Sequence, residues 1–269
     1  WAYYRQAQRP RSGGLGPGAL AGALIGLLPE DDPVIRRDRE RLEAVKTERS
    51  ALADEYFRQN AKQWDMIRSL HVGDLRVEEA IADLLPSDGV EDFLDIGTGT
   101  GQMIALFGER SSRAVGVDTS RDMLTVARSN LENTPLSNWS LRQGDMYELP
   151  MADATFSVAV IHQVLHYAEH PDVAIAEAAR VLRPGGQLIV VDFAPHELED
   201  LRDTHYHRRL GFSDDVIEGW FRQAGLVPHR TVHLPGEPLT VGLWSATRAG
   251  DDRNSEDIPE HENVTKLHR

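Results

Sequence analysis

Short apolar runs alternate with longer amphipathic segments through the middle of the chain. The apolar runs predict strands near residues 91–96, 113–118, 139–143, 156–161 and 187–193. The segments between them predict helices near residues 101–109, 120–132 and 171–182. Strands that alternate with helices call for a mostly parallel sheet with right-handed crossovers. The pattern therefore predicts a doubly wound α/β domain.

The pattern changes after the fifth predicted strand. Ser213 introduces a further predicted helix at 213–224, and the segments 226–233 and 239–247 read as a hairpin joined by Pro235-Gly236-Glu237-Pro238. The run Arg183-Pro184-Gly185-Gly186 is expected to end the helix before it and to turn into the fifth strand. The hairpin is expected to add antiparallel strands to the sheet.

A helical segment is predicted before the first strand, from Pro33 to about Leu70, with Asp32 as its N-cap. An apolar seam at helical spacing, interrupted by Arg49, runs along it: Leu42, Val45, Leu52 and Tyr56. Two interpretations stay open. Either the seam pairs two subunits, or the helix lies solvated on its own domain.

A glycine-rich turn follows the first predicted strand, in the run Phe93-Leu94-Asp95-Ile96-Gly97-Thr98-Gly99-Thr100-Gly101. Alternate glycines let the backbone take dihedrals that side chains forbid, and they let a ligand approach the main chain closely. A dinucleotide fingerprint needs a third glycine at position 102, where this chain has Gln102. The turn therefore predicts a site for a nucleoside-bearing cofactor and argues against NAD and FAD.

Two more strand ends carry acidic residues. Asp118 stands at the tip of the second strand, where a carboxylate accepts hydrogen bonds from both ribose hydroxyls and repels phosphate. After the third strand, Asp145 is placed to accept from the exocyclic amine of adenine, and Met146 to cover the adenine ring. The three strand ends together predict a binding site for an adenosine that carries no phosphate groups.

These motifs resemble the class I S-adenosylmethionine-dependent methyltransferases over roughly residues 71 to 248. Besides the glycine turn, the resemblance rests on residues 143–145, 156–161 and 177–186, in the family's order and spacing. Ser157 departs from it, because relatives usually carry an aspartate there, but that position is structural. The resemblance implies a seven-stranded Rossmann-like methyltransferase fold, here with a helical N-terminal extension.

The resemblance also implies S-adenosylmethionine as cofactor and S-adenosylhomocysteine as its product. It gives cofactor-binding roles to residues at the strand ends: Asp95, Gly97, Thr98, Gly99, Gly101, Asp118, Thr119, Met123, Gly144, Asp145, Met146 and His162. Residues 56–65 resemble the segment that folds over the cofactor in many of these enzymes, which adds Tyr56 and Trp64. The alternative for these two is a place in the core.

Methyl transfer needs in-line alignment of acceptor and methyl group, and it needs a base only when the acceptor carries a proton. In the resembled family the loop after the fourth strand faces the methyl group. Here that loop holds His162 and His166, which share one face if the loop is helical. We predict a catalytic base at one of the two, with ordinary packing or cofactor contact as the alternative.

A second group of histidines and carboxylates follows the fifth strand: Asp192, His196, Asp203, His205 and His207. It lacks a full set of metal ligands at familiar spacing, so no metal is predicted. These side chains are expected to shape the acceptor pocket or to lie on the surface.

The composition of the chain limits the classes of molecule that can be the methyl acceptor. The chain has 269 residues, 41% of them hydrophobic, which suffices for one core and an appendage. The absence of cysteine excludes disulfides, thiolate zinc sites and arsenite held by thiolates. A net charge of −14 disfavours a nucleic-acid substrate, so a small-molecule acceptor is expected. With no long apolar run and no signal peptide, we expect a cytoplasmic protein that does not contact membranes.

The chain opens on Trp1-Ala2-Tyr3-Tyr4-Arg5 without an initiator methionine and reads as a fragment. This segment resembles the last wing strand of an ArsR-type winged-helix domain, a type sometimes fused to a methyltransferase fold. The alternative is a truncated end without meaning. The expected organisation has four parts: a wing end with linker (1–28), a helical connector (29–70), the cofactor-binding domain (71–248) and an acidic, disordered tail (249–269).

Two functions stay open. The chain is either an enzyme that methylates a small molecule, or an ArsR-type transcriptional regulator that senses S-adenosylmethionine or S-adenosylhomocysteine. A regulator would bind DNA only through a winged-helix domain before Trp1. A homodimer through the N-terminal region is also expected.

Overall fold

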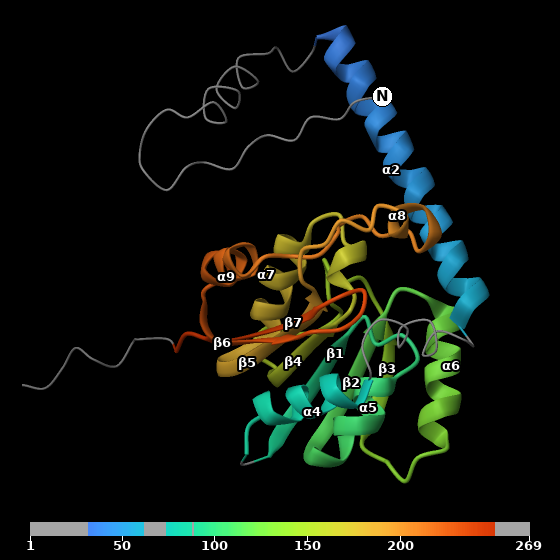
Figure 1. Cartoon of the computed structure of the whole chain (residues 1–269). Helices are drawn as coiled ribbons and strands as arrows, with labels where there is room; N and C mark the ends of the chain where they lie inside the picture. Colours follow the sequence, from blue (N-terminus) through green and yellow to red (C-terminus); the bar gives the residue numbers. More distant parts are fainter. Residues whose placement is uncertain (1–31, 62–73, 88, 251–269) are drawn as a thin grey trace, which may run out of the picture. The chain divides into compact units, whose positions relative to one another are not determined.

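The computed structural model describes residues 32–61, 74–87 and 89–250 (Figure 1). The predicted wing end and linker, Trp64 and residues 251–269 of the predicted tail lie outside the described residues. The chain divides into two compact units, Trp1–Leu52 and Ala53–Arg269, and the second contains the sheet.

The larger unit is built on a seven-stranded sheet with the order β3-β2-β1-β4-β5-β7-β6. Its strands are β1 Val90–Ile96, β2 Ser111–Asp118, β3 Trp139–Gln143, β4 Phe156–His162, β5 Leu182–Phe193, β6 Leu226–Leu234 and β7 Val241–Arg248. Strand β7 runs antiparallel to β5 and β6, and the other pairings are parallel. The predicted α/β fold is confirmed, including the hairpin at the end of the sheet.

Helices cover both faces of the sheet (Figure 1). They are α4 Asp74–Leu84, α5 Gln102–Phe107, α6 Arg121–Glu132, α7 Pro171–Val181 and α9 Asp214–Gln223. Successive strand residues point to opposite faces, so Phe93 packs with α4 and α5, whereas Leu94 and Ile96 pack with α7 and α9. Strands buried on both faces read as continuous apolar runs, which is why the sequence located most of them well.

The start of β5 differs from the prediction. Helix α7 ends at Val181, and Leu182 already pairs with Phe156 of β4. The next pair joins Gln187 to Val158, so the run Arg183-Pro184-Gly185-Gly186 lies inside the strand as an irregularity instead of before it. Gly185 takes a φ of 78°, which lets the backbone bend there without leaving the sheet.

Two helical segments also differ from the prediction. Helix α4 was not expected, although Val77, Ile81 and Leu85 follow at four-residue spacing and are buried against the sheet. The helix expected at 101–109 is the short α5 followed by a 3-10 turn, η2 Gly108–Arg110.

Helix α2 spans Pro33–Asn60. Asp32 caps it as predicted, because its Oδ1 accepts from the backbone N–H groups of Val34 at 2.8 Å and Ile35 at 3.3 Å. Two residues of the predicted seam in the smaller unit, Leu42 and Leu52, are 45% and 46% exposed. Their pairing with a second subunit stays a prediction. None of the helices in the described residues is both long and apolar enough to cross a membrane.

Candidate functional site

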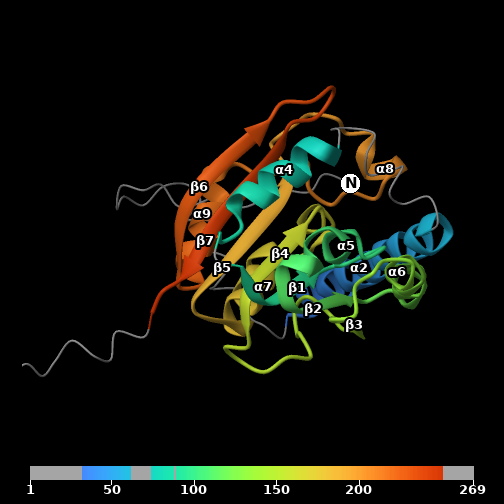
Figure 2. The ribbon, with the colours of Figure 1, turned by 90° about the horizontal axis from the view of Figure 1, so that it is seen from below.

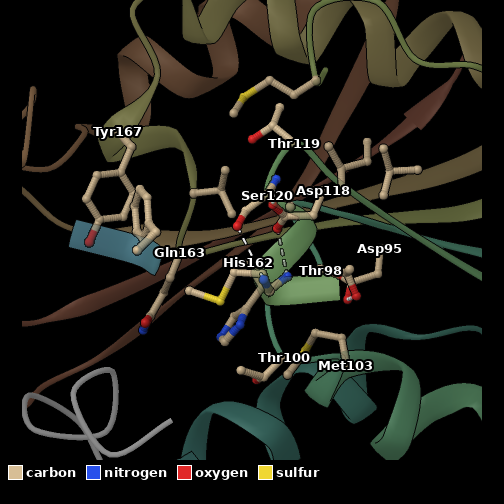
Figure 3. A pocket seen from close by; sticks show the side chains of 18 of the residues that line it. Asp95, Thr98, Thr100, Met103, Asp118, Thr119, Ser120, His162, Gln163 and Tyr167 are labelled. Carbon is tan, nitrogen blue, oxygen red and sulfur yellow. Dashed lines mark hydrogen bonds between the residues drawn. The ribbon is translucent and has the colours of Figure 1, made fainter. Parts of the chain in front are cut away.

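A pocket opens at the carboxyl ends of the central strands (Figure 3). Strands β1 and β4 are neighbours there, and the chain proceeds from β1 towards β2 and β3, but from β4 towards β5. Such a switch in strand order is where open α/β sheets bind their ligands. Predicted residues that line the pocket are Asp95, Gly97, Thr98, Gly99, Asp118, Thr119, Met123, Gly144, Met146 and His162.

The glycine turn forms the floor of the pocket. Gly97 has a φ of 73°, and a Cβ at this position would lie 2.5 Å from Cγ2 of Val164, so a side chain does not fit. The backbone N–H groups of Gly97 and Thr98 both donate to the carbonyl of Val117 in β2. The Thr98 hydroxyl also donates to Oδ2 of the buried Asp95 at 2.6 Å. These bonds fix the shape of the turn.

Asp118 stands at the end of β2, as predicted, with both carboxylate oxygens held by the main chain. Oδ2 accepts from the N–H of Gly99 at 2.9 Å, and Oδ1 from the N–H of Ser120 at 2.8 Å. Ser120 in turn caps α6, because its Oγ accepts from Met123 N at 3.2 Å. These two bonds orient the Asp118 carboxylate at the end of β2.

The end of β3 and the start of α6 form the side of the pocket where adenine is expected. Met123, Gly144 and Met146 line it, and Gly144 N donates to the carbonyl of Asp118 at 3.1 Å. Asp145 is exposed, does not line the pocket, and accepts from Tyr147 N at 3.0 Å within its own turn. Its predicted contact with adenine stays a prediction.

The two predicted catalytic histidines have different surroundings. His162 is the last residue of β4, is buried and lines the pocket. Gln163 then takes a φ of 53°, which turns the chain into the 3-10 helix η3 Leu165–Tyr167. The segment is therefore not one α-helix, and the condition under which His162 and His166 would share a helical face is not met.

His166 does not line the pocket and is bonded to Asp192 of β5 instead. Its Nδ1 lies 2.9 Å from Oδ1 of Asp192, and its backbone N–H donates to Oδ2 at 3.1 Å. Both side chains are buried, with 3% and 0% exposed. The carboxylate thus fixes the orientation of the His166 ring.

Aromatic rings form the wall beside these histidines. Phe57, from the end of α2 that belongs to the larger unit, lines the pocket together with Tyr167, and their ring centroids are 4.8 Å apart. The neighbouring Tyr56 does not line the pocket, and its hydroxyl lies 2.6 Å from Nδ1 of His205. Burial above all, with Tyr56 and Asp192 nearby, raises the pKa of Tyr167 well above its usual value. Tyr167 is therefore a neutral hydroxyl near neutral pH.

The second histidine group lies in this wall. His207 is buried between His166 and Phe193, with ring centroids 4.2 Å and 5.8 Å away. His205 is half-buried, and burial lowers its pKa. Among the described residues, no group of three or more His, Cys, Asp or Glu side chains is arranged to hold a metal ion.

Several lining residues were missed by the sequence reasoning: Phe57, Thr100, Gln102, Met103, Ser120, Gln163 and Tyr167. Most of them neighbour the predicted motifs, and that adjacency is the signal that would have found them. Gly101, on the other hand, is buried and does not line the pocket. It precedes α5 as its N-cap with a φ of 83°.

The fold and the site define a Rossmann-like α/β domain with a pocket at the carboxyl ends of its central strands. A family model described as a methyltransferase domain matches residues 94–190. The chain is 34% identical over 198 residues to a demethylmenaquinone methyltransferase of Thermus thermophilus, covering 71% of this chain and 89% of that enzyme. It therefore belongs to the class I S-adenosylmethionine-dependent methyltransferases.

Two other similarities are less complete. A ubiquinone/menaquinone biosynthesis C-methyltransferase of Dinoroseobacter shibae is 34% identical over 154 residues, covering 55% of this chain and 61% of the relative. The first three curated relatives are covered over between 33% and 89% of their length. The solved [4+2]-cyclase SpnF shares the fold with a TM-score of 0.57 at 20% identity, covering 65% of this chain and 80% of the cyclase.

Proposed function

We propose that this chain transfers a methyl group from S-adenosylmethionine to a small-molecule acceptor. The observation that carries the proposal is Asp118, a carboxylate pre-oriented by two backbone N–H groups at the end of β2. The residues that line the pocket fit the cofactor. A carboxylate can accept hydrogen bonds from ribose hydroxyls, and the thioethers of Met123 and Met146 can pack against an adenine ring. When bound, the cofactor supplies a methyl group that is already activated on a sulfonium.

The class of acceptor follows from charge and from the relatives. Two similar proteins are by name methyltransferases of quinone biosynthesis, which supports a small organic acceptor here as well. The net charge of −14 works against nucleic acid. Phe57 and Tyr167 give the pocket an aromatic wall that favours contact with an apolar or planar acceptor.

His162 is the stronger of the two candidates for the catalytic base. It lines the pocket, whereas His166 lies behind it and is bonded to Asp192. An acceptor hydroxyl or amine would lose its proton to the His162 imidazole while the acceptor atom takes the methyl group. His166, held by Asp192, would keep η3 and Tyr167 in place, with a direct role as base as the alternative.

Sensing without methyl transfer is the second candidate function. It is favoured by the resemblance of Trp1-Ala2-Tyr3-Tyr4-Arg5 to a wing strand, a segment outside the described residues. The solved [4+2]-cyclase with this fold is a reminder that the fold alone does not entail methyl transfer. In that case no acceptor supports turnover, and DNA binding through a domain before Trp1 shifts cofactor affinity by a reciprocal factor.

The test incubates the protein with methyl-labelled S-adenosylmethionine and a metabolite extract. Label transferred to a small molecule supports the enzyme, and His162→Ala should lower that transfer by roughly a hundredfold with cofactor affinity nearly intact. The control is His229→Gln, which changes an exposed histidine of β6. No transfer with any fraction, combined with tight cofactor binding, would favour the sensor.

A further inference from the structure

Gln163 follows β4 directly and takes a backbone φ of 53°. This is the left-handed region, where the Cβ of a residue other than glycine crowds the backbone, so the conformation is costly. Contacts on both sides nevertheless fix it. The N–H of Gln163 donates to the carbonyl of Val191 in β5 at 2.7 Å, and the next residue, Val164, packs closely on Gly97. Strain that the surrounding structure enforces in this way is concentrated at functional sites.

The strained turn brings two consecutive side chains to the same pocket. In a regular strand, successive side chains point to opposite faces of the sheet. Strand β4 lies between β1 and β5 in the middle of the sheet (Figure 2), and its last residue, His162, lines the pocket. Because the chain turns at Gln163, the side chain of this residue lines the same pocket (Figure 3). The turn therefore places a second polar side chain next to the candidate base.

The side-chain amide of Gln163 is open to the pocket. The side chain is half-buried, no hydrogen bond joins its amide to the described residues, and neither amide atom is sealed from solvent. The turn itself needs no such side chain, because glycine takes this φ without strain and asparagine takes it more readily than most side chains do. The place of the amide in the pocket therefore accounts for the glutamine, whereas the turn does not.

The surroundings of Gln163 indicate which ligand its amide meets. Asp118 and Met146, the residues proposed for ribose and adenine, follow or end strands β2 and β3. Gln163 and Tyr167 lie together on the opposite side of the pocket from Asp118 (Figure 3). The ring of Tyr167 there contacts the ring of Phe57 to form the aromatic wall. The amide therefore lies on the side of the pocket that the adenosine leaves to the acceptor.

Resting on the proposed methyl transfer, we infer that Gln163 selects the acceptor, by a hydrogen bond from its amide to a hydroxyl or carbonyl group of a planar molecule. An amide carries N–H donors and a carbonyl acceptor without a charge, so it pairs with a hydroxyl or a carbonyl group. The rings of Phe57 and Tyr167 contact the planar body of the same molecule. Gln163 is then a specificity-determining residue, and it leaves the transfer of a proton to His162.

The experiment follows the transfer of label from methyl-labelled S-adenosylmethionine to a dilution series of a metabolite extract, with the full chain. Gln163→Met keeps the length of the side chain and removes its hydrogen bonds. It should raise the extract concentration for half-maximal transfer about tenfold. Its affinity for S-adenosylhomocysteine, measured by calorimetry, should equal that of the wild type. Gln223→Met, at the exposed end of α9, is the matched control and should behave as the wild type in both assays.

Two further measurements distinguish a contact with the acceptor from a structural role. Gln163→Gly should show the same loss of transfer without a lower Tm, because relief of the left-handed strain offsets the greater freedom of the unfolded chain. Mass spectrometry of the labelled product should show a planar compound with a hydroxyl, methoxyl or carbonyl group. This variant also decides the question should Gln163→Met fold poorly.

The outcomes separate this inference from the proposed function. No label transfer by the wild type would remove the proposed function and this inference with it. Three results would overturn the acceptor contact while methyl transfer stands: unchanged transfer in both variants of Gln163, a loss of cofactor affinity equal to the loss of transfer, or a labelled product without such an oxygen group. A lower Tm in Gln163→Gly would likewise overturn it, because the glutamine would then serve the fold.

Discussion

The Asp118 carboxylate is oriented before any ligand arrives, since two backbone N–H groups already hold it. Asp118→Ala removes two charge-assisted hydrogen bonds to ribose, each worth roughly 1.5–3 kcal/mol before water replaces part of them. We expect a loss of cofactor affinity of about tenfold or more, measured by calorimetry with S-adenosylhomocysteine. Asp122→Ala, an exposed residue of α6, is the matched control. Unchanged affinity in Asp118→Ala would contradict the ribose contact.

His166 is expected to matter first for stability. Its replacement by alanine removes the side-chain donor that the described residues provide to the buried Asp192 carboxylate, which costs about 1.5–3 kcal/mol in the free energy of unfolding, plus a cavity term. Chemical denaturation measures this loss. His166→Asn keeps an N–H group near the position of Nδ1 and should recover part of it. A full loss of turnover in the asparagine variant at near-normal stability would instead identify His166 as the base.

At the residue scale, local motifs were predictable and distant contacts were not. Gly97 and Asp118 follow from the sequence because a strand, a turn and an acidic tip are local patterns. Phe57 and Tyr167 come from segments far apart in the chain, and only the fold brings their rings together. Gln102 was noticed only because it is not a glycine. Its bond to Glu78 requires α4, which the sequence reasoning did not predict.

At the scale of helices and strands, the predicted boundaries are wrong where the local preference of the residues disagrees with tertiary packing. Proline and glycine at 184–186 favour a turn, yet pairing of Leu182 with Phe156 keeps the run inside β5. Helix α4 carries a short apolar stripe among charged residues. Burial of this stripe against the sheet stabilises a helix that intrinsic helix propensity alone does not predict.

The contact between the end of α2 and the segment after α8 (Leu201–Thr204) is expected to depend on pH. Burial lowers the pKa of His205, Asp200 opposes this and His166 adds to it. A lowered pKa means that the unfolded chain binds the proton more readily. The stability contributed by neutral His205 is therefore complete above about pH 6.5 and is lost as the pH falls through the lower folded value.

Thermal unfolding between pH 7.5 and 5.5 tests this prediction. The wild type should lose more stability on acidification than His205→Gln, in which the amide oxygen can still accept from the Tyr56 hydroxyl. His229→Gln, at an exposed position, should keep the wild-type pH dependence. Identical pH profiles for the wild type and His205→Gln would contradict the assignment.

At the scale of the whole molecule, the match to the methyltransferase family model and the pocket both lie in the larger of the two units. The family model covers residues 94–190, which lie inside the unit Ala53–Arg269. Every described residue that lines the pocket belongs to that unit. Cofactor binding is therefore expected to need only the larger unit, and the smaller unit Trp1–Leu52 is free to serve another purpose.

That purpose is expected to be self-association through α2. Leu42 and Leu52 are exposed on the described helix, whereas Tyr56, the last residue of the predicted seam, contacts His205 within its own chain. The intact chain should be a dimer by light scattering, and deletion of residues 1–50 should give a monomer that binds S-adenosylhomocysteine with unchanged affinity. Leu42→Glu with Leu52→Glu should also give a monomer, because two buried charges would oppose pairing. Leu75→Glu, at an exposed apolar position of α4, should leave the dimer intact. A monomeric intact chain, or a dimer that survives the deletion, would contradict association through this helix.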